Sequence, residues 1–411
     1  MSVAPKSCLP APVRLALLVS LTSLALPVFA HSGLPMEEGI SASLDLAVSW
    51  RSKNQLSDAD IHNQVVWQMP GLLMGGHASA YQQNSTLDQA SLRMQYLSAD
   101  RSYAMVKVGS HGDSEVSLEN AMAGQSWEWA GQSLSAEAGR MTAFFSPFNH
   151  QHPADAAFSL TPLAYSGLLG GHVEDVGVRM SVGEALHGLS AGIEHYQGSR
   201  FPAADSGGLS GLFVRHAGVL EQLDWQLQGW LLDASANNRQ DDRSASSHSH
   251  SASSSTAFSG YFDGDTRVAG LFGDIGYRWA NNWRLGLVAE YMSSQVNGQV
   301  TDSAATRVIQ LDGDYQSLLL EPGLTLGAQR LAVRYEVLHI INRLTGTAVD
   351  TLADEAGLIN DGHNPQRLAA VWHWQYNGHT GVRLEWMSDQ SMPDRQPVVM
   401  TAGVIWKGEL L

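Results

Sequence analysis

The stretch "VAGLFGDIGYRWANNWRLGLVAEYM", residues 268–292, decides the fold class. On both sides of the turn signal "ANN", apolar and polar residues alternate with period two, the pattern of β-strands that have two different faces. The apolar face carries Ala269, Leu271, Ile275, Tyr277 and Trp279 before the turn, and Trp283, Leu285, Leu287, Ala289 and Tyr291 after it. The opposite face carries Asp274, Arg278, Arg284 and Glu290. Aromatic residues beside the turn match the interfacial girdle of a transmembrane β-barrel.

The same plan recurs elsewhere in the chain. The stretches "ISASLDLAVSW" (40–50), "LLLEPGLTLGAQRLAVRYEVLHI" (318–340) and "LAAVWHWQYNGHTGVRLEWM" (368–387) also alternate. A soluble antiparallel sandwich alternates too. However, these apolar faces continue for about nine to twelve residues, whereas an ordinary strand has about five or six. We therefore predict an all-β fold, a transmembrane antiparallel barrel of about 16 strands (roughly 12 to 18), with long extracellular loops and short periplasmic turns.

Composition agrees with a membrane barrel. Charged residues make up 16% of the chain, and the 411 residues include 40 Gly and 12 Trp. In an ordinary soluble domain, roughly a quarter of the residues are charged. The formal charge of −16 argues against nucleic acid as a partner and favours cations. The partners that we expect are outer-membrane lipid and a divalent cation or small solute, and a homo-oligomer is left open.

The first thirty residues have the features of a cleavable signal peptide. Lys6 and Arg14 precede the apolar run "LALLVSLTSLALPV", and "VFA" ends before His31. Export would leave residues 31–411 as a single barrel domain in the outer membrane of a Gram-negative cell. The only cysteine, Cys8, would be removed with the signal, which excludes disulfides and thiol chemistry.

Turn signals alternate between tight and long. The tight turns are "ANN", "GAQR" and "YNGHT", and the long loops are predicted at about 235–265, 296–306 and 341–365. The first of these contains a serine-rich tract with His248 and His250, which has too few apolar residues to form a core.

Candidate metal ligands lie in two stretches. "FNHQHPADAAFSL" (148–160) contains His150, His152 and Asp155, and "GGHVEDVG" (170–177) contains His172, Glu174 and Asp175. An H-x-H pair on an extended backbone places both imidazoles on one side, and imidazole with carboxylate suits Zn²⁺. His248 and His250 form a second such pair on the serine-rich loop. The alternative for both sets is ordinary loop polarity.

Residues 138–180, "AGRMTAFFSPFNHQHPADAAFSLTPLAYSGLLGGHVEDVGVRM", resemble a family of Gram-negative outer-membrane barrels described as zinc-regulated. The positions that carry the resemblance are Gly139, Arg140, Phe144, Phe145, Asn149, Gln151, His152, Asp155, Pro162, Leu163, Tyr165, Leu169, Gly170, Gly171, Glu174, Asp175 and Gly177. The resemblance implies zinc-linked transport across the outer membrane. Some members are called TonB-dependent receptors, but the first predicted strand begins too early here for an N-terminal plug, which favours a porin-like barrel without an energy source.

The sequence thus predicts a porin-like protein for passive uptake or binding of a divalent cation, with zinc as a transported or transiently bound ion and no tightly bound cofactor. Two alternatives stay open, a general porin for small solutes and an outer-membrane lipid hydrolase or deacylase. We expect no enzyme, because the chain has neither G-x-S-x-G nor H-E-x-x-H, and "GGLSGL" around Ser210 has the pattern of a strand.

Overall fold

The computed structural model describes residues 38–52, 69–73, 84–111, 116–183, 187–240, 260–279, 282–393 and 396–411. All of them belong to one compact unit, Leu34–Leu411. The predicted signal peptide, the serine-rich tract at 241–259, and with it His248 and His250, lie outside the described residues.

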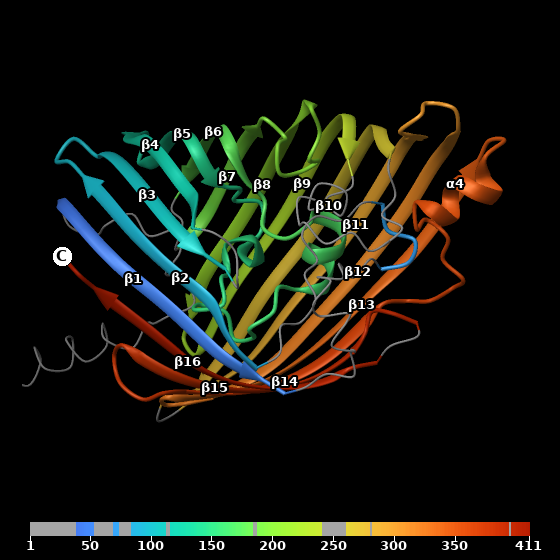
Figure 1. Ribbon diagram of the computed structural model, residues 1–411. Helices are drawn as coiled ribbons and strands as arrows, with labels where there is room; N and C mark the ends of the chain where they lie inside the picture. Colours follow the sequence, from blue (N-terminus) through green and yellow to red (C-terminus); the bar gives the residue numbers. More distant parts are fainter. Residues whose placement is uncertain are drawn as a thin grey trace, which may run out of the picture. The chain divides into compact units, whose positions relative to one another are not determined.

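The fold is a closed barrel of sixteen antiparallel strands, each paired with its neighbour in sequence (Figure 1). The strands are β1 (Gly39–Arg51), β2 (Asn84–Leu97), β3 (Ser102–Ser110), β4 (Ser117–Trp129), β5 (Gln132–Thr142), β6 (Glu174–Gly183), β7 (Gly188–Tyr196), β8 (Ser206–Leu220), β9 (Leu223–Gln240), β10 (Gly260–Trp279), β11 (Trp283–Asp302), β12 (Val308–Leu326), β13 (Gln329–Thr345), β14 (Gln366–Gln375), β15 (Thr380–Gln390) and β16 (Val398–Glu409). The barrel closes where β1 pairs with β16, from Ser43 opposite Glu409 to Arg51 opposite Thr401. The predicted fold class and strand number are confirmed.

The wall has an apolar outer face and a polar inner face. On β10 and β11, Leu271 and Leu285 are 62% and 54% exposed, whereas Glu290 is 3% exposed. Arg334 of β13 is also buried, and its Nη2 lies 2.8 Å from Oε2 of Glu321 on β12. A soluble protein buries its apolar face instead, so this arrangement is that of a membrane-spanning barrel. No helix in the described part of the chain is long and apolar enough to cross a bilayer.

Short and long connections lie at opposite ends of the barrel, as the sequence predicts. At one end, residues 221–222 join β8 to β9 and residues 327–328 join β12 to β13. At the other end, residues 143–173 join β5 to β6, and residues 346–365, with helix α4 (Val349–Glu355), join β13 to β14. In Figure 1, α4 lies beside the end of β13.

The predicted bounds of the long loops are wrong in three places. β9 continues to Gln240 and β10 begins at Gly260, so only the centre of the 235–265 loop connects strands. Residues 296–302 belong to β11, and residues 341–345 belong to β13. The β10–β11 hairpin is paired without a register shift from Trp279 and Trp283 up to Gly260 and Asp302. Backbone hydrogen bonding therefore continues beyond the apolar face that the sequence pattern detects.

Residues 143–173, here called the inner segment, fold into the barrel. The segment contains a short 3-10 helix, η1 (Pro147–His150), and one turn of π-helix, η2 (Tyr165–Leu169). Gly170 ends η2 in the left-handed conformation, with φ of 75°. Phe145, Phe148 and Tyr165 are all less than 2% exposed.

Two parts of the inner wall differ in their exposure to water. The open wall, on β2 to β6 towards the short turns, is half-buried and mostly polar: Gln95, Met105, Ser126, Ser135 and Ser181. The packed wall, on β11 to β13 towards the long connections, is buried and apolar: Val296, Val300, Ile309, Leu311, Leu338 and Ile340. Leu72, Leu168 and Leu352 belong to the same apolar cluster as the packed wall. Loop residues thus fill the barrel on that side.

Candidate functional site: the inner segment and its histidine cluster

Carboxylates of the wall accept hydrogen bonds from the inner segment. Glu290 of β11 accepts from Ser146 Oγ at 2.6 Å and from the Tyr165 hydroxyl at 3.0 Å. Glu336 of β13 accepts from the backbone N–H of Leu163 at 2.5 Å. Farther along the wall, the backbone N–H of Ser159 donates to Glu385 of β15 at 2.9 Å. A segment inside a barrel has no regular partner for its backbone, and these buried side chains supply one.

Arginines of the same wall donate to carbonyl oxygens of the inner segment. Arg334 contacts the Leu160 oxygen at 3.4 Å, and Arg367 contacts the Thr161 oxygen at 3.2 Å. Arg383, which is fully buried, donates to the Pro153 oxygen at 2.9 Å. Because each arginine also has a carboxylate near it on the wall, the alternating charges predicted from the strands form the frame that holds this segment.

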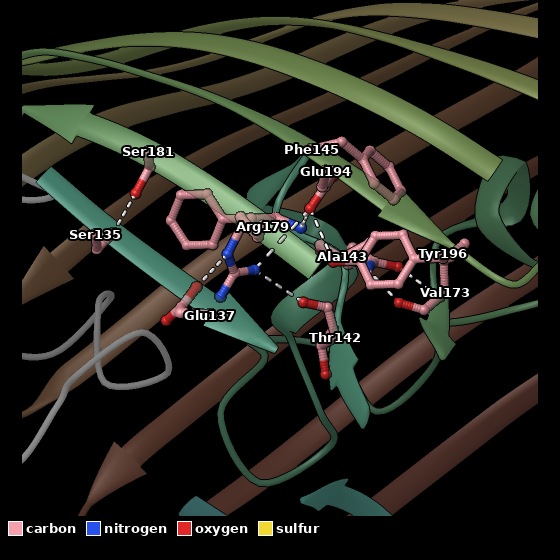
Figure 2. Close-up of polar contacts among 12 residues, drawn as sticks. Ser135, Glu137, Thr142, Ala143, Phe145, Val173, Arg179, Ser181, Glu194 and Tyr196 are labelled. Atoms are coloured by element: carbon pink, nitrogen blue, oxygen red, sulfur yellow. Dashed lines mark hydrogen bonds and ion pairs between the residues drawn. The ribbon is translucent and has the colours of Figure 1, made fainter. Parts of the chain in front are cut away.

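The two ends of the inner segment are tied together beside β5, β6 and β7. The Ala143 N–H donates to the Val173 oxygen at 2.9 Å, and Asn149 Nδ2 donates to both the Ala143 and the Val173 oxygens. Figure 2 shows the wall at this point, where Arg179 extends between Glu137 and Glu194. Glu194 in turn accepts from the Phe144 N–H at 2.8 Å. The segment is therefore fixed at its ends as well as along its length.

Three histidines and one glutamate meet where the inner segment touches β3 and β4. The His111 and His152 rings are stacked at 5.2 Å, and the His152 and His172 rings lie 4.9 Å apart. Glu119 Oε1 is 2.9 Å from His111 Nε2, and Glu119 Oε2 is 2.6 Å from Lys107 Nζ. Burial lowers the pKa of His172 to about 4, which keeps its imidazole neutral at pH 7. The structure thus brings together two predicted candidates, His152 and His172, and adds His111 and Glu119.

The other predicted candidates lie apart from this cluster. His150 ends η1, and its ring packs edge-on against Phe144 at 5.1 Å. The expectation that His150 and His152 point to one side assumed an extended backbone, and the 3-10 turn removes that condition.

The three carboxylates have partners of their own. Asp155 accepts a hydrogen bond from Lys407 of β16, and Glu174 lies 3.2 Å from Arg140. Asp175 accepts from the N–H and the hydroxyl of Ser199, both at 2.6 Å. These contacts fix the backbone around the inner segment and give each carboxylate a partner other than the histidines of the cluster.

Two members of the cluster, His111 and Glu119, are absent from the sequence prediction. Glu119 is the extra residue of a β-bulge, because Lys107 pairs with Asn120 while Val108 pairs with Leu118. A bulge redirects a side chain, and a regular alternation count does not detect it. His111 follows directly on the end of β3 and shows no spacing relation to the other histidines.

The barrel is similar to solved outer-membrane barrels. OprB of Pseudomonas putida matches with a TM-score of 0.54 and 11% identity, over 90% of this chain and 94% of that one. DcaP, an outer membrane channel of Acinetobacter baumannii, matches with 0.49 and 8%, over 90% and 96%. The trimer form of OmpT, an outer membrane protein of Vibrio cholerae, matches with 0.48 and 11%, over 90% and 100%.

At such identities the similarity is one of fold. In sequence, no family model and no curated protein matches this chain, so the zinc-regulated family stays a prediction. What is established is the architecture, a closed sixteen-stranded membrane barrel that is similar in fold to OprB.

Proposed function

We propose that this protein is a porin-like channel of the outer membrane, through which small hydrophilic solutes diffuse without an energy source. The observation that carries the proposal is the open wall, where half-buried polar side chains line the barrel interior beside the inner segment. Water that reaches these side chains begins a hydrated route at the short-turn end of β2 to β6, which in this proposal continues past the inner segment. The inner segment, tied to the wall from β2 to β16, sets the width of that route.

An excess of carboxylates in the barrel favours cations over anions. The described part of the chain buries thirteen Asp and Glu side chains but only seven Arg and Lys side chains. The chain as a whole carries a formal charge of −16. Rings of carboxylates favour cations in channels. Several of the buried carboxylates are engaged by the inner segment, so the preference should be moderate.

Recording from planar bilayers tests the proposal. The barrel, refolded from detergent, should give discrete conductance steps, and a KCl gradient should give a reversal potential of the cation-selective sign. A folded barrel, identified by its heat-modifiable mobility on gels, that produced no steps would contradict a channel. Steps with an anion-selective reversal potential would contradict the charge argument alone.

Zinc uptake is the narrower form of this proposal, and the histidine cluster beside the inner segment is what favours it. Proteoliposomes loaded with a zinc-sensitive dye should then admit Zn²⁺ faster than Mg²⁺ at equal concentration. Equal rates for both ions, together with entry of a small uncharged sugar, would leave a general porin for small solutes.

The hydrolase alternative has weaker support. On the barrel wall, His195 Nδ1 of β7 lies 3.0 Å from Ser210 Oγ of β8. Asp233 is opposite Ser210 in the β8–β9 register, but its carboxylate is 2.9 Å from Arg267. A Ser–His pair needs a third group to orient the imidazole, and the nearest cross-strand carboxylate is engaged elsewhere. The geometry therefore supports a channel better than a hydrolase.

A further inference from the structure

We propose that His111, Glu119 and His152 bind one borderline divalent cation, with Zn²⁺ as the ion that suits the donors best. Their ligand atoms lie within 4.8 Å of one another. Ligands of a single tetrahedral zinc are about 3–4 Å apart, so side-chain rotations suffice to bring these atoms into coordination. Two imidazole nitrogens and one carboxylate oxygen are donors that Zn²⁺ prefers over Mg²⁺ or Ca²⁺. The site does not depend on whether the barrel conducts.

The backbone of the barrel wall fixes the position of the Glu119 carboxylate. The bulge at Glu119 turns this side chain towards Gly109 of the neighbouring strand. A Cβ added to Gly109 would lie 1.9 Å from Glu119 Oε1, so the carboxylate occupies space that only glycine leaves. Lys107 holds the other oxygen, Oε2, at 2.6 Å. The carboxylate therefore presents Oε1 alone to the histidines, as a single ligand atom whose direction is fixed by an outer ion pair.

His172 packs against His152, with the two ring centroids 4.9 Å apart. Its Nδ1 lies 2.9 Å from the Asn149 carbonyl oxygen, which can only accept, so Nδ1 carries the hydrogen. The lone pair is then on Nε2. In histidines that bind metals, the ring nitrogen that does not contact the metal commonly donates a hydrogen bond to a backbone carbonyl. The same Asn149 ties the ends of the inner segment through its side-chain amide, so a shift of the segment would move His152 and His172 together.

The site joins two parts of the molecule. His111 and Glu119 belong to the wall, whereas His152 and His172 belong to the inner segment. His111 has a side chain that is 37% exposed, which gives a cation access to the cluster from solvent. A bound ion would thus cross-link the inner segment to the β3–β4 wall. Lys107 neutralises part of the carboxylate charge, so we expect an exchangeable ion rather than a permanently bound one.

Metal titration of the refolded full-length chain in detergent tests the site. Zn²⁺ is measured by competition with a chromophoric chelator, and Co²⁺ by the d–d absorption of an N/O-coordinated ion. The wild type should bind one ion per barrel, and His152→Ala should weaken binding at least about tenfold. Gly109→Ala should weaken it too, because it displaces the Glu119 carboxylate while the barrel stays folded. The matched control is His150→Ala, which removes the other histidine of the same H-x-H pair and should leave affinity unchanged.

The outcomes separate this site from the channel. No saturable Zn²⁺ binding by the folded wild type would overturn the site, as would equal affinity of wild type and His152→Ala. If His150→Ala lost as much Zn²⁺ affinity as His152→Ala, the site would also be overturned. That result would indicate binding by the H-x-H pair, His150 and His152, instead. Conductance recorded in metal-free buffer is an independent measurement. Conductance steps from a barrel that binds no Zn²⁺ would reject only the metal site. Zn²⁺ binding by a barrel that gives no conductance steps would reject only the channel.

Discussion

The open wall and the packed wall belong to the same barrel, yet they differ in what their side chains contact. Ser135 and Ser181 on the open wall are half-buried and are hydrogen-bonded to one another at 2.6 Å (Figure 2). Val300 and Leu311 on the packed wall are almost completely buried, in one apolar cluster with Leu352. The difference indicates that a sixteen-stranded barrel need not enclose one uniform pore. Loops can fill the barrel with an apolar core near the long connections, while part of the wall near the short turns stays open to water.

The largest effect should come from placing a charge in the packed wall. Leu311→Asp buries a carboxylate without a partner among Val300, Ile309 and Leu352, and we expect a loss of about 3–5 kcal/mol in the free energy of unfolding. Urea titration of the folded barrel, followed by gel mobility, measures it. The control is Ser126→Asp on the open wall, where water solvates the new charge. If both variants unfolded at the same urea concentration, the two walls would not differ.

A smaller and different effect should follow from adding bulk. Ser181→Trp on the open wall should reduce single-channel conductance by about half or more, because it narrows the hydrated route, with little change in stability. Ala236→Trp, at a buried position of β9, should instead destabilise the barrel by about 1–3 kcal/mol through overpacking and leave the conductance of folded barrels unchanged. If Ala236→Trp reduced the conductance and Ser181→Trp reduced the stability instead, the hydrated route would not run past the open wall.

The smallest effect should come from the exposed rim. Arg307 forms two hydrogen bonds to Glu355 of α4, at 2.7 and 2.8 Å, and both side chains are largely exposed. Exposed ion pairs contribute little, so Glu355→Gln, which leaves the contact between Arg307 and Asp302 in place, should hardly move the urea midpoint. Arg307 holds the pKa of Glu355 below its ordinary value. Any difference from wild type should therefore be present at neutral pH and disappear as the pH falls through that lowered pKa. A large shift would show that α4 depends on this pair.

The sequence predicts the wall of the barrel because membrane strands follow a strict rule. Alternation over "VAGLFGDIGYRW" assigns Leu271 outward and Asp274 inward without any knowledge of the neighbouring strands. The strand ends are different: at Asn297 and Gly298 the apolar face has ended, but hydrogen bonding to β10 continues. Pattern alone therefore places the outer ends of β11 and β13 too early.

The inner segment is less predictable because its partners are distant in sequence. His152 and His172 are recognisable as candidate ligands, but their meeting with His111 depends on a loop that folds into the barrel. The position of Glu119 depends on a bulge that no spacing rule reveals. Conversely, Asp155 and Glu174 have the right chemistry for a metal, yet Lys407 and Arg140 engage them. The sequence reveals which residue types could bind a metal, but it does not reveal their neighbours in three dimensions.

The long-range ties of the inner segment also bear on how the chain assembles. Ser159 and Glu385 are 226 residues apart in sequence, and Pro153 and Arg383 are 230 apart. Such contacts close large loops and form late in folding. Until β15 is added, Arg383 and Glu385 are not yet in place to receive the segment. The inner segment can therefore make all of its contacts only when β15 is in place, so its packing and the closing of the barrel depend on the same hairpin.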